Sequence, residues 1–131
     1  MKYLIDTDWV IDHLRREPKV STRLEELSAE GLAMSIVSLA ELYEGILYSR
    51  DPAKSEEGLR RFLHPDIAIL GLDDATCRLF GNERGRLRRD GKAVGDMDLL
   101  IASTCLQHNL TLLTNNRRHF EVIEGLEIVS V

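Results

Sequence analysis

The sequence predicts an α/β domain in which a central, mostly parallel sheet of five strands is flanked by helices on both faces. Three observations predict this fold class. Five short apolar runs recur along the chain, segments of helical period separate them, and the 131 residues contain no repeat or low-complexity tract. Short apolar runs are typical of strands buried on both sides, and their alternation with helices indicates a parallel sheet. Residues 1–131 are expected to form one compact domain without linkers.

The elements follow in order along the chain. The expected strands are residues 3–5, 32–36, 67–70, 110–113 and 126–129, and the expected helices cover about residues 8–16, 20–30, 38–49, 53–63, 73–90 and 97–108. Gly31 stands where a C-cap glycine belongs, Pro52 opens a helix, and Asp73 and Asp96 occupy N-cap positions. In parallel sheets ligands bind beyond the carboxyl ends of the strands, so the polar residues that follow each strand are the candidate site residues.

Composition limits the classes of protein. The net charge of -5 argues against a protein that coats nucleic acid indiscriminately. Cys77 and Cys105 lack metal-ligand spacing and are expected to be buried free thiols. Only three apolar residues precede Asp6, and no apolar run approaches the length of a membrane span, so a cytoplasmic protein without membrane contact is expected.

The first expected strand ends in acidic residues. Asp6, Thr7 and Asp8 follow the buried run YLI directly. Either Thr7 or Asp8 is expected to cap the next helix. A single cap does not explain a second acid at the end of this strand, so Asp6 is a candidate site residue.

The second expected strand leads into SIVSLAELYEGIL. At 100 degrees per residue, this helix places Leu39, Ala40, Leu42, Tyr43, Ile46 and Leu47 on one apolar face, with Ser38, Glu41, Glu44 and Gly45 opposite. Periodicity alone favours a solvated Glu41. Its position in the first turn beyond a strand makes it a site candidate, and Gly45 would leave room above its carboxylate for a substrate backbone.

The stretch GDMDLLIASTCL is apolar almost all round and predicts a buried helix. Asp96 is explained as its N-cap. Asp98 shares a face with Ile101, Ala102 and Cys105 and is expected to point into protein, where a carboxylate needs a partner.

The apolar run NLTLLT is followed by Asn115, Asn116 and Arg117. Turn chemistry alone accounts for two asparagines. They nevertheless fall at the carboxyl end of another strand, which is the sheet edge expected to carry Asp6.

Four blocks in this order resemble the signature blocks of PIN-domain ribonucleases, specifically VapC-type toxins of toxin-antitoxin modules. They are LIDTDWVID, SLAELYEG, GDMDLLIASTCLQHNLTLLTNN and RRHFEVIEGLEI, and they span essentially the whole chain. The resemblance implies that Asp6, Glu41 and Asp98 are the metal ligands and that Asn116 is the fourth catalytic position. The family often has aspartate at that position, so the resemblance leaves open whether one or two ions act.

The resemblance further implies a Mg2+-dependent endoribonuclease, with Mn2+ as a substitute, that hydrolyses RNA phosphodiester bonds. It also implies a VapB-type antitoxin partner and a toxin homodimer. The chemistry suits the residues, because two carboxylates about 4 Å apart repel by roughly 4 kcal/mol at an effective dielectric of 20 and all-oxygen ligands favour hard divalent ions. Thr7, Ser38 and Thr114 are expected to support the carboxylates or the attacking water, with Asp96 either assisting them or only capping its helix.

RNA must be guided into an acidic site by cations. Arg117 and Arg118 are the first candidates because they follow Asn116, and Arg84 and Arg88 lie on a basic helical stripe that alternatively is an ordinary solvated face. The four histidines, His13, His64, His108 and His119, show no ligand spacing and are interpreted as surface or structural residues.

Two alternatives belong to other classes. A haloacid-dehalogenase-like phosphatase would use Asp6 and Asp8 of DTDW, but it also needs a lysine, and Lys92 lies in a glycine-flanked turn. A non-catalytic PIN-type binding module would have a degenerate site, against which the intact Asp6, Glu41 and Asp98 argue.

Overall fold

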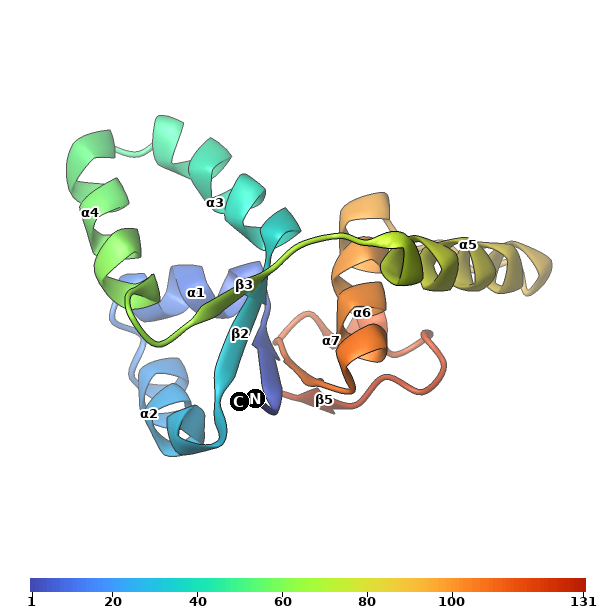
Figure 1. The fold of residues 1–131 in the computed structure, drawn as a ribbon. Helices are drawn as coiled ribbons and strands as arrows, with labels where there is room; N and C mark the ends of the chain where they lie inside the picture. Colours follow the sequence, from blue (N-terminus) through green and yellow to red (C-terminus); the bar gives the residue numbers. More distant parts are fainter.

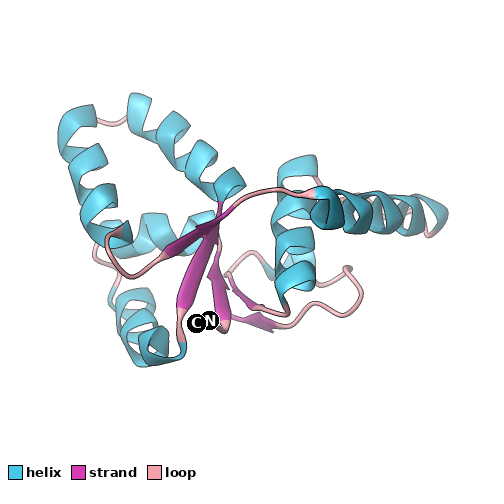
Figure 2. Ribbon diagram, viewed as in Figure 1, coloured by secondary structure: helices cyan, strands magenta, loops and turns pink.

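The computed structural model describes residues 1–131 as a sheet of five strands between two layers of helices (Figures 1 and 2). The strands are β1 (Tyr3–Ile5), β2 (Leu32–Ser35), β3 (Ala68–Leu70), β4 (Thr111–Leu113) and β5 (Ile128–Val129). The helices are α1 (Thr7–Leu14), α2 (Pro18–Leu27), α3 (Ile36–Leu47), α4 (Pro52–Leu63), α5 (Asp74–Arg89), α6 (Asp96–His108) and α7 (Arg117–Phe120), with a 3-10 turn η1 (Ser28–Glu30). The predicted α/β class is confirmed.

The strand order is β3-β2-β1-β4-β5, and every neighbouring pair is parallel. The chain builds one half of the sheet from β1 through β2 to β3, and then returns to add β4 and β5 on the other side of β1. This reversal between β1 and β4 is a topological switch point, where the connections leave in opposite directions and open a crevice at the carboxyl ends of the strands.

The sheet separates two apolar cores, because successive side chains of a strand point to opposite faces. Tyr3 and Ile5 face a core shared with α1 to α4, whereas Leu4 between them faces a core shared with α5, α6 and α7. Figure 1 shows these helix sets on opposite sides of the sheet, with α5 extending outward. Because both faces are covered, all three residues of β1 are buried, which explains why the run carries no polar residue before Asp6.

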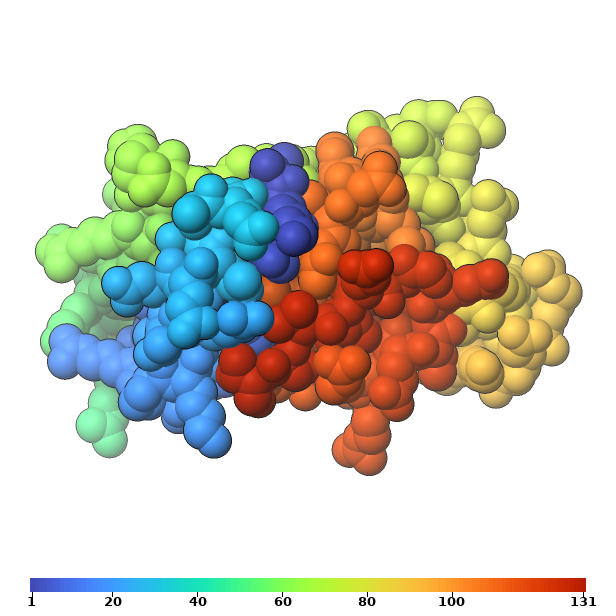
Figure 3. All heavy atoms as spheres, turned by 90° about the horizontal axis from the view of Figure 1, so that it is seen from below, coloured from blue at the N-terminus to red at the C-terminus, as the bar shows by residue number.

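The opposite, amino-terminal end of the sheet is closed by the first residues of the chain. Figure 3 shows these residues, in dark blue, lying between the light-blue segment near residue 30 and an orange segment, with the red C-terminal segment below them. The backbone N–H groups of Lys2 and Tyr3 donate to the Gly31 carbonyl. Gly31 has a φ of +90, and a Cβ there would lie 2.7 Å from the Met1 Cα, so only glycine fits this junction.

Two predicted helix caps are wrong. Helix α1 begins directly after the strand, so its N-cap is Asp6 rather than Thr7 or Asp8. Gly95, without a side-chain bond, is the N-cap of α6, and Asp96 lies inside the first turn, where it pairs with Arg84. The predicted cap at Asp73 is confirmed by a capping box with Thr76.

The predicted apolar face of α3 is also partly wrong. Ser38, placed on the polar face, is fully buried, whereas Tyr43 and Leu47 are 42% and 73% exposed. The first turn of α3 contacts β2 and α6, and these contacts bury Val37 and Ser38. The end of the helix extends beyond the sheet, so its apolar residues remain at the surface.

Both cysteines are free, as predicted, but only Cys105 is buried. Cys77 is exposed because it lies on the outer side of α5. None of the helices has both the length and the apolar character needed to cross a membrane.

Candidate active site

Asp6 lies at the switch point between β1 and β4. Asp6 is only 3% exposed, although its side chain is a carboxylate. Oδ1 accepts a hydrogen bond from the Thr7 N–H at 2.8 Å, and Oδ2 accepts one from the Thr114 hydroxyl at 2.7 Å. Thr114 directly follows β4, so these bonds join the ends of the two strands.

The charge of Asp6 is poorly compensated. Burial raises the pKa of Asp6 to about 7; the hydrogen bond from Thr114 opposes this shift, while the nearby charges of Asp8 and Asp98 add to it. Burial also raises the pKa of Asp8, against the hydrogen bonds that its carboxylate accepts from the backbone N–H groups of Asn115 (2.9 Å) and Trp9 (2.8 Å). The site therefore holds more negative charge than the protein neutralises.

Thr7 lies between Glu41 and Asp6 and forms hydrogen bonds with both. The Thr7 hydroxyl donates a 2.7 Å hydrogen bond to Glu41 Oε1, while the N–H of the same residue holds Asp6. One turn further along α3, a Cβ on Gly45 would meet no atom within 4 Å, which agrees with the predicted open space. Ser38, one turn before Glu41, has a buried hydroxyl without a hydrogen-bond partner.

The two acids of α6 have different surroundings. The Asp98 side chain is 28% exposed, and its Oδ2 lies 3.0 Å from His119 Nδ1. Its negative charge is close enough to Asp6 to help raise the pKa of that carboxyl. The Asp96 side chain is 80% exposed and forms an ion pair with Arg84. The structure therefore brings Asp98, and not Asp96, together with Asp6.

The turn after β4 completes this edge. Asn116 is the N-cap residue of α7, its N–H donates to the Thr114 hydroxyl at 3.0 Å, and the residue is exposed. The neighbouring Asn115 was absent from the predicted site, yet its Oδ1 accepts hydrogen bonds from Trp9 Nε1 at 3.1 Å and from the Val131 N–H at 3.0 Å. Asn115 thus fixes the turn to α1, a role that its place in the TNN run does not reveal.

The three predicted ligands fit a hard cation in their donor chemistry. As they stand, no three Asp, Glu, His or Cys side chains are close enough together to surround one ion. Each carboxylate nevertheless keeps acceptor capacity beyond its hydrogen bonds to the protein: Asp6 through its remaining lone pairs, Glu41 through Oε2, and Asp98 through Oδ1. Carboxylates anchored in this way, together with the unpaired buried hydroxyl of Ser38 on the same helix as Glu41, match the supported oxygen ligands of Mg2+ and Mn2+.

The predicted RNA-binding arginines differ in whether their side chains are already bonded within the protein. Arg84 donates to the Val94 carbonyl at 2.8 Å as well as to Asp96, and Arg117 donates to Ser130 Oγ at 3.0 Å. Arg88 and Arg118 are exposed and form no ion pair. Arg118 therefore remains the freest cation beside Asn116.

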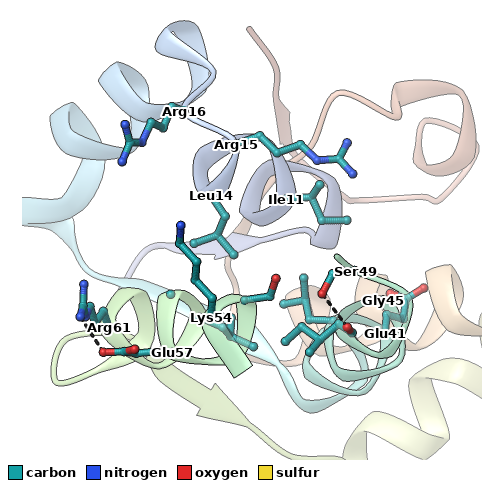
Figure 4. Close-up of a pocket in the computed structure, with 15 residues that line it drawn as sticks. Ile11, Leu14, Arg15, Arg16, Glu41, Gly45, Ser49, Lys54, Glu57 and Arg61 are labelled. Atoms are coloured by element: carbon teal, nitrogen blue, oxygen red, sulfur yellow. Dashed lines mark hydrogen bonds and ion pairs between the residues drawn. The ribbon is translucent and has the colours of Figure 1, made fainter. Parts of the chain in front are cut away.

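A groove of about 570 Å³ lies between α1, α3 and α4 (Figure 4). Its lining includes Leu14 and Gly58, and Glu41 of the site also borders it. Figure 4 shows Lys54 pointing into the groove and Arg15 and Arg16 along one side. The groove thus combines apolar side chains with several cations, although the chain as a whole is acidic.

Comparison with known proteins shows the family of this chain. The model of the family described as PIN domain matches residues 3–126. The chain belongs to the PIN-domain family. Its curated relatives include Ribonuclease VapC2 of Haemophilus influenzae, 32% identical over 96% of this chain and 95% of the relative. They also include the tRNA(fMet)-specific endonuclease VapC of Shigella flexneri, 30% identical over 96% and 95%. The resemblance to VapC-type PIN domains is confirmed.

Solved PIN-family structures agree with this fold. The VapBC2 complex of Rickettsia felis bound to a promoter DNA fragment contains a chain with a TM-score of 0.92 and 28% identity, covering 100% of this chain and 99% of that one. DNA-bound VapBC of Salmonella typhimurium gives a TM-score of 0.90 at 27% identity, covering 99% and 98%.

The phosphatase alternative finds no support in this site. Both carboxylate oxygens of Asp8 accept backbone hydrogen bonds, and Asp8 thereby holds the turn at Asn115. The match of the PIN-domain model to residues 3–126 also argues against a phosphatase.

Proposed function

We propose that this PIN domain, residues 1–131, is a Mg2+-dependent endoribonuclease and the toxin of a toxin-antitoxin module. One observation carries the proposal. Carboxylates from three segments that are distant in the sequence lie at one edge of the sheet. Thr7 donates hydrogen bonds to both Asp6 and Glu41, and the negative charge of Asp98 contributes to the raised pKa of Asp6. Relatives over nearly the whole chain are named ribonucleases, which supports the same activity here.

Each residue of the site has a distinct proposed role. Asp6, Glu41 and Asp98 would hold the ion, which when bound activates a water and neutralises charge on the leaving oxygen. Thr7 and Thr114 orient the carboxylates of Glu41 and Asp6 through their hydroxyls. The exposed amide of Asn116 stands at the same edge to contact the scissile phosphate, and Arg118 beside it supplies a cation for the RNA backbone.

The purified chain should cleave total cellular RNA in the presence of Mg2+, and excess EDTA should abolish the cleavage. The physical reason is that the carboxylates alone repel a phosphate backbone. The measurement is 5′-end mapping of the products, which also identifies the sequence that is cut. Undiminished cleavage in EDTA would contradict a metal-dependent mechanism, whereas RNA binding without cleavage would favour the non-catalytic binding module.

The proposed protein partner is a VapB-type antitoxin. The solved relatives are VapBC complexes, and the groove between α1, α3 and α4 suits an amphipathic helix. Leu14 offers apolar contact, while Arg15 and Arg16 on one side and Lys54 within the groove would pair with acidic residues of such a helix. Because Glu41 borders the groove, a segment bound there reaches the site that it would inhibit.

Gly58→Trp should weaken binding of the cognate antitoxin by at least about tenfold, because the indole would occupy the groove where the apolar face of the helix packs. Gly58 lies on α4, and a Cβ there meets nothing within 4 Å, so the fold should tolerate the change. Gly81→Trp is the matched control, since Gly81 is an equally open helical glycine outside the groove. Affinity is measured by calorimetry; equal affinities for both variants would place the antitoxin elsewhere.

We also propose a cytoplasmic homodimer, as the resemblance implies. Ile36, Tyr43 and Leu47 lie along one side of α3 and are 39%, 42% and 73% exposed, and a second copy would cover such a stripe.

A further inference from the structure

His119 lies beside Asp98 although 21 residues separate them in the sequence. The contact is made by α7, a four-residue helix whose Phe120 is fully buried in the core shared with α6. Phe120 fixes the position of α7, so His119 is held next to Asp98 while its own side chain stays 59% exposed. A histidine that serves only solubility would not need this anchored position.

The contact has a defined chemistry. A carboxylate only accepts hydrogen bonds, so the ring nitrogen Nδ1, 3.0 Å from Asp98 Oδ2, must carry the proton and donate it. Nε2 of the same ring makes no hydrogen bond within the protein. Asp98 Oδ1 makes none either, so it keeps its full capacity to accept a ligand.

Each of the other two proposed ligands has its own anchor. Asp6 is held by the Thr7 N–H and the Thr114 hydroxyl, and Glu41 is held by the Thr7 hydroxyl. Asp98 has no such bond from a threonine or from the backbone, and the His119 ring is its one hydrogen-bond donor. Without it, the partly exposed carboxylate would rotate freely about its side-chain bonds.

We propose that His119 is a positioning residue that fixes Asp98 by Oδ2 and leaves Oδ1 for the divalent ion. The inference rests on the proposed function and gives α7, the helix that also carries Arg118, a second role at the site. Donors that orient a ligating carboxylate in this way commonly change metal affinity by 10- to 100-fold, roughly, when removed.

The test uses the geometry of two amides. The asparagine side chain places its N–H₂ group where histidine places Nδ1, whereas glutamine places its N–H₂ group where histidine places Nε2. His119→Asn should therefore retain Mn2+ affinity close to wild type, while His119→Gln and His119→Ala should bind Mn2+ about tenfold more weakly. His108→Ala, an exposed histidine at the end of α6, is the control and should bind Mn2+ as wild type does.

The probe is Mn2+ alone, titrated into the full chain by calorimetry, with thermal melts to establish that every variant is folded. Wild-type affinity in all variants would overturn the role of His119. Equal weakening in the asparagine variant would also overturn it, because the imidazole itself would then be required instead of a donor at the Nδ1 position. A wild-type protein that binds no Mn2+ and cleaves RNA in EDTA would refute the proposed function first, and this inference with it.

Discussion

Asp98→Asn should lower the rate of RNA cleavage by about 1000-fold or more and should abolish growth arrest in cells that express the chain. The substitution removes one negative charge from the three carboxylates that would hold the ion, and a metal ion contributes several kcal/mol to stabilising the charge of a phosphoryl transition state. Asparagine keeps the shape of the side chain and can accept the hydrogen bond from His119, so folding should be little affected. Initial rates on a fluorogenic RNA at saturating Mg2+ would measure the loss.

Asp96→Asn is the matched control, because it makes the same change two residues earlier on the same helix. Asp96 is 80% exposed and pairs with Arg84, so its loss should reduce the rate less than about threefold and cost little stability, as exposed ion pairs do. If Asp96→Asn is as inactive as Asp98→Asn, the division of roles between the two acids is wrong and both serve the site.

Without metal, the wild-type chain should lose stability as pH rises from about 5 to about 8, and Asp6→Asn should remove much of that loss. Burial, together with the charges of Asp8 and Asp98, raises the pKa of Asp6 to about 7 in the folded chain. In the unfolded chain this carboxyl titrates near 4. The stabilising contribution of its proton is therefore full below about pH 4 and is lost as pH rises through about 7, on the order of a few kcal/mol.

Asparagine is neutral at every pH and resembles the protonated carboxyl, because a carbonyl oxygen that accepts stands beside a donor group, N–H₂ in place of O–H. Urea unfolding at pH 5 and pH 8 in EDTA would show the effect, with wild type and Asp6→Asn closest at pH 5 and the variant more stable at pH 8. Adding Mn2+ at pH 8 should stabilise the wild type and leave the variant unchanged, since ligand binding to the folded state alone stabilises it. A wild type that is as stable at pH 8 as its variant in EDTA would contradict the poorly compensated charge.

The central acids of the site were predictable because they depend on strand ends. Asp6 follows a buried run, and parallel strands place their carboxyl ends at one edge, so its location follows from the pattern. Asp98 shared a helical face with Ile101 and Cys105, which predicted that it would need a partner. The choice of Glu41 and Asn116 came from the family resemblance, because periodicity alone left the glutamate in solvent and the asparagine in a turn.

The contacts that support these acids were not predictable, since they join segments with no local pattern between them. His119 was interpreted as a surface or structural residue, and its pairing with Asp98 depends on α7, which is too short for a periodicity signal. Asn115 looked like turn chemistry, but its amide bridges Trp9 and Val131 across the sheet edge. Ser38 was placed on the polar face because helical projection does not show which side of α3 meets α6.

The fold itself followed largely from the alternation of apolar runs and helical segments, with most boundaries moved by one or two residues. The four-residue helix α7 was not expected, and the other errors occur where neighbouring elements meet. Helix α1 starts at Thr7, immediately after the strand, so Asp6 takes the capping position as well as its place in the site. A residue that serves two purposes in this way gives no separate sequence signal for each.

The central claim is that Asp6, Glu41 and Asp98 together hold one hard divalent ion. Crystals of the chain grown with Mn2+ and measured by anomalous X-ray scattering would test it most directly. We predict an anomalous peak in direct contact with oxygens of all three carboxylates, with Asp98 bound through Oδ1 and still hydrogen-bonded to His119. A peak elsewhere in the molecule, or no peak at a Mn2+ concentration that supports cleavage, would contradict the account.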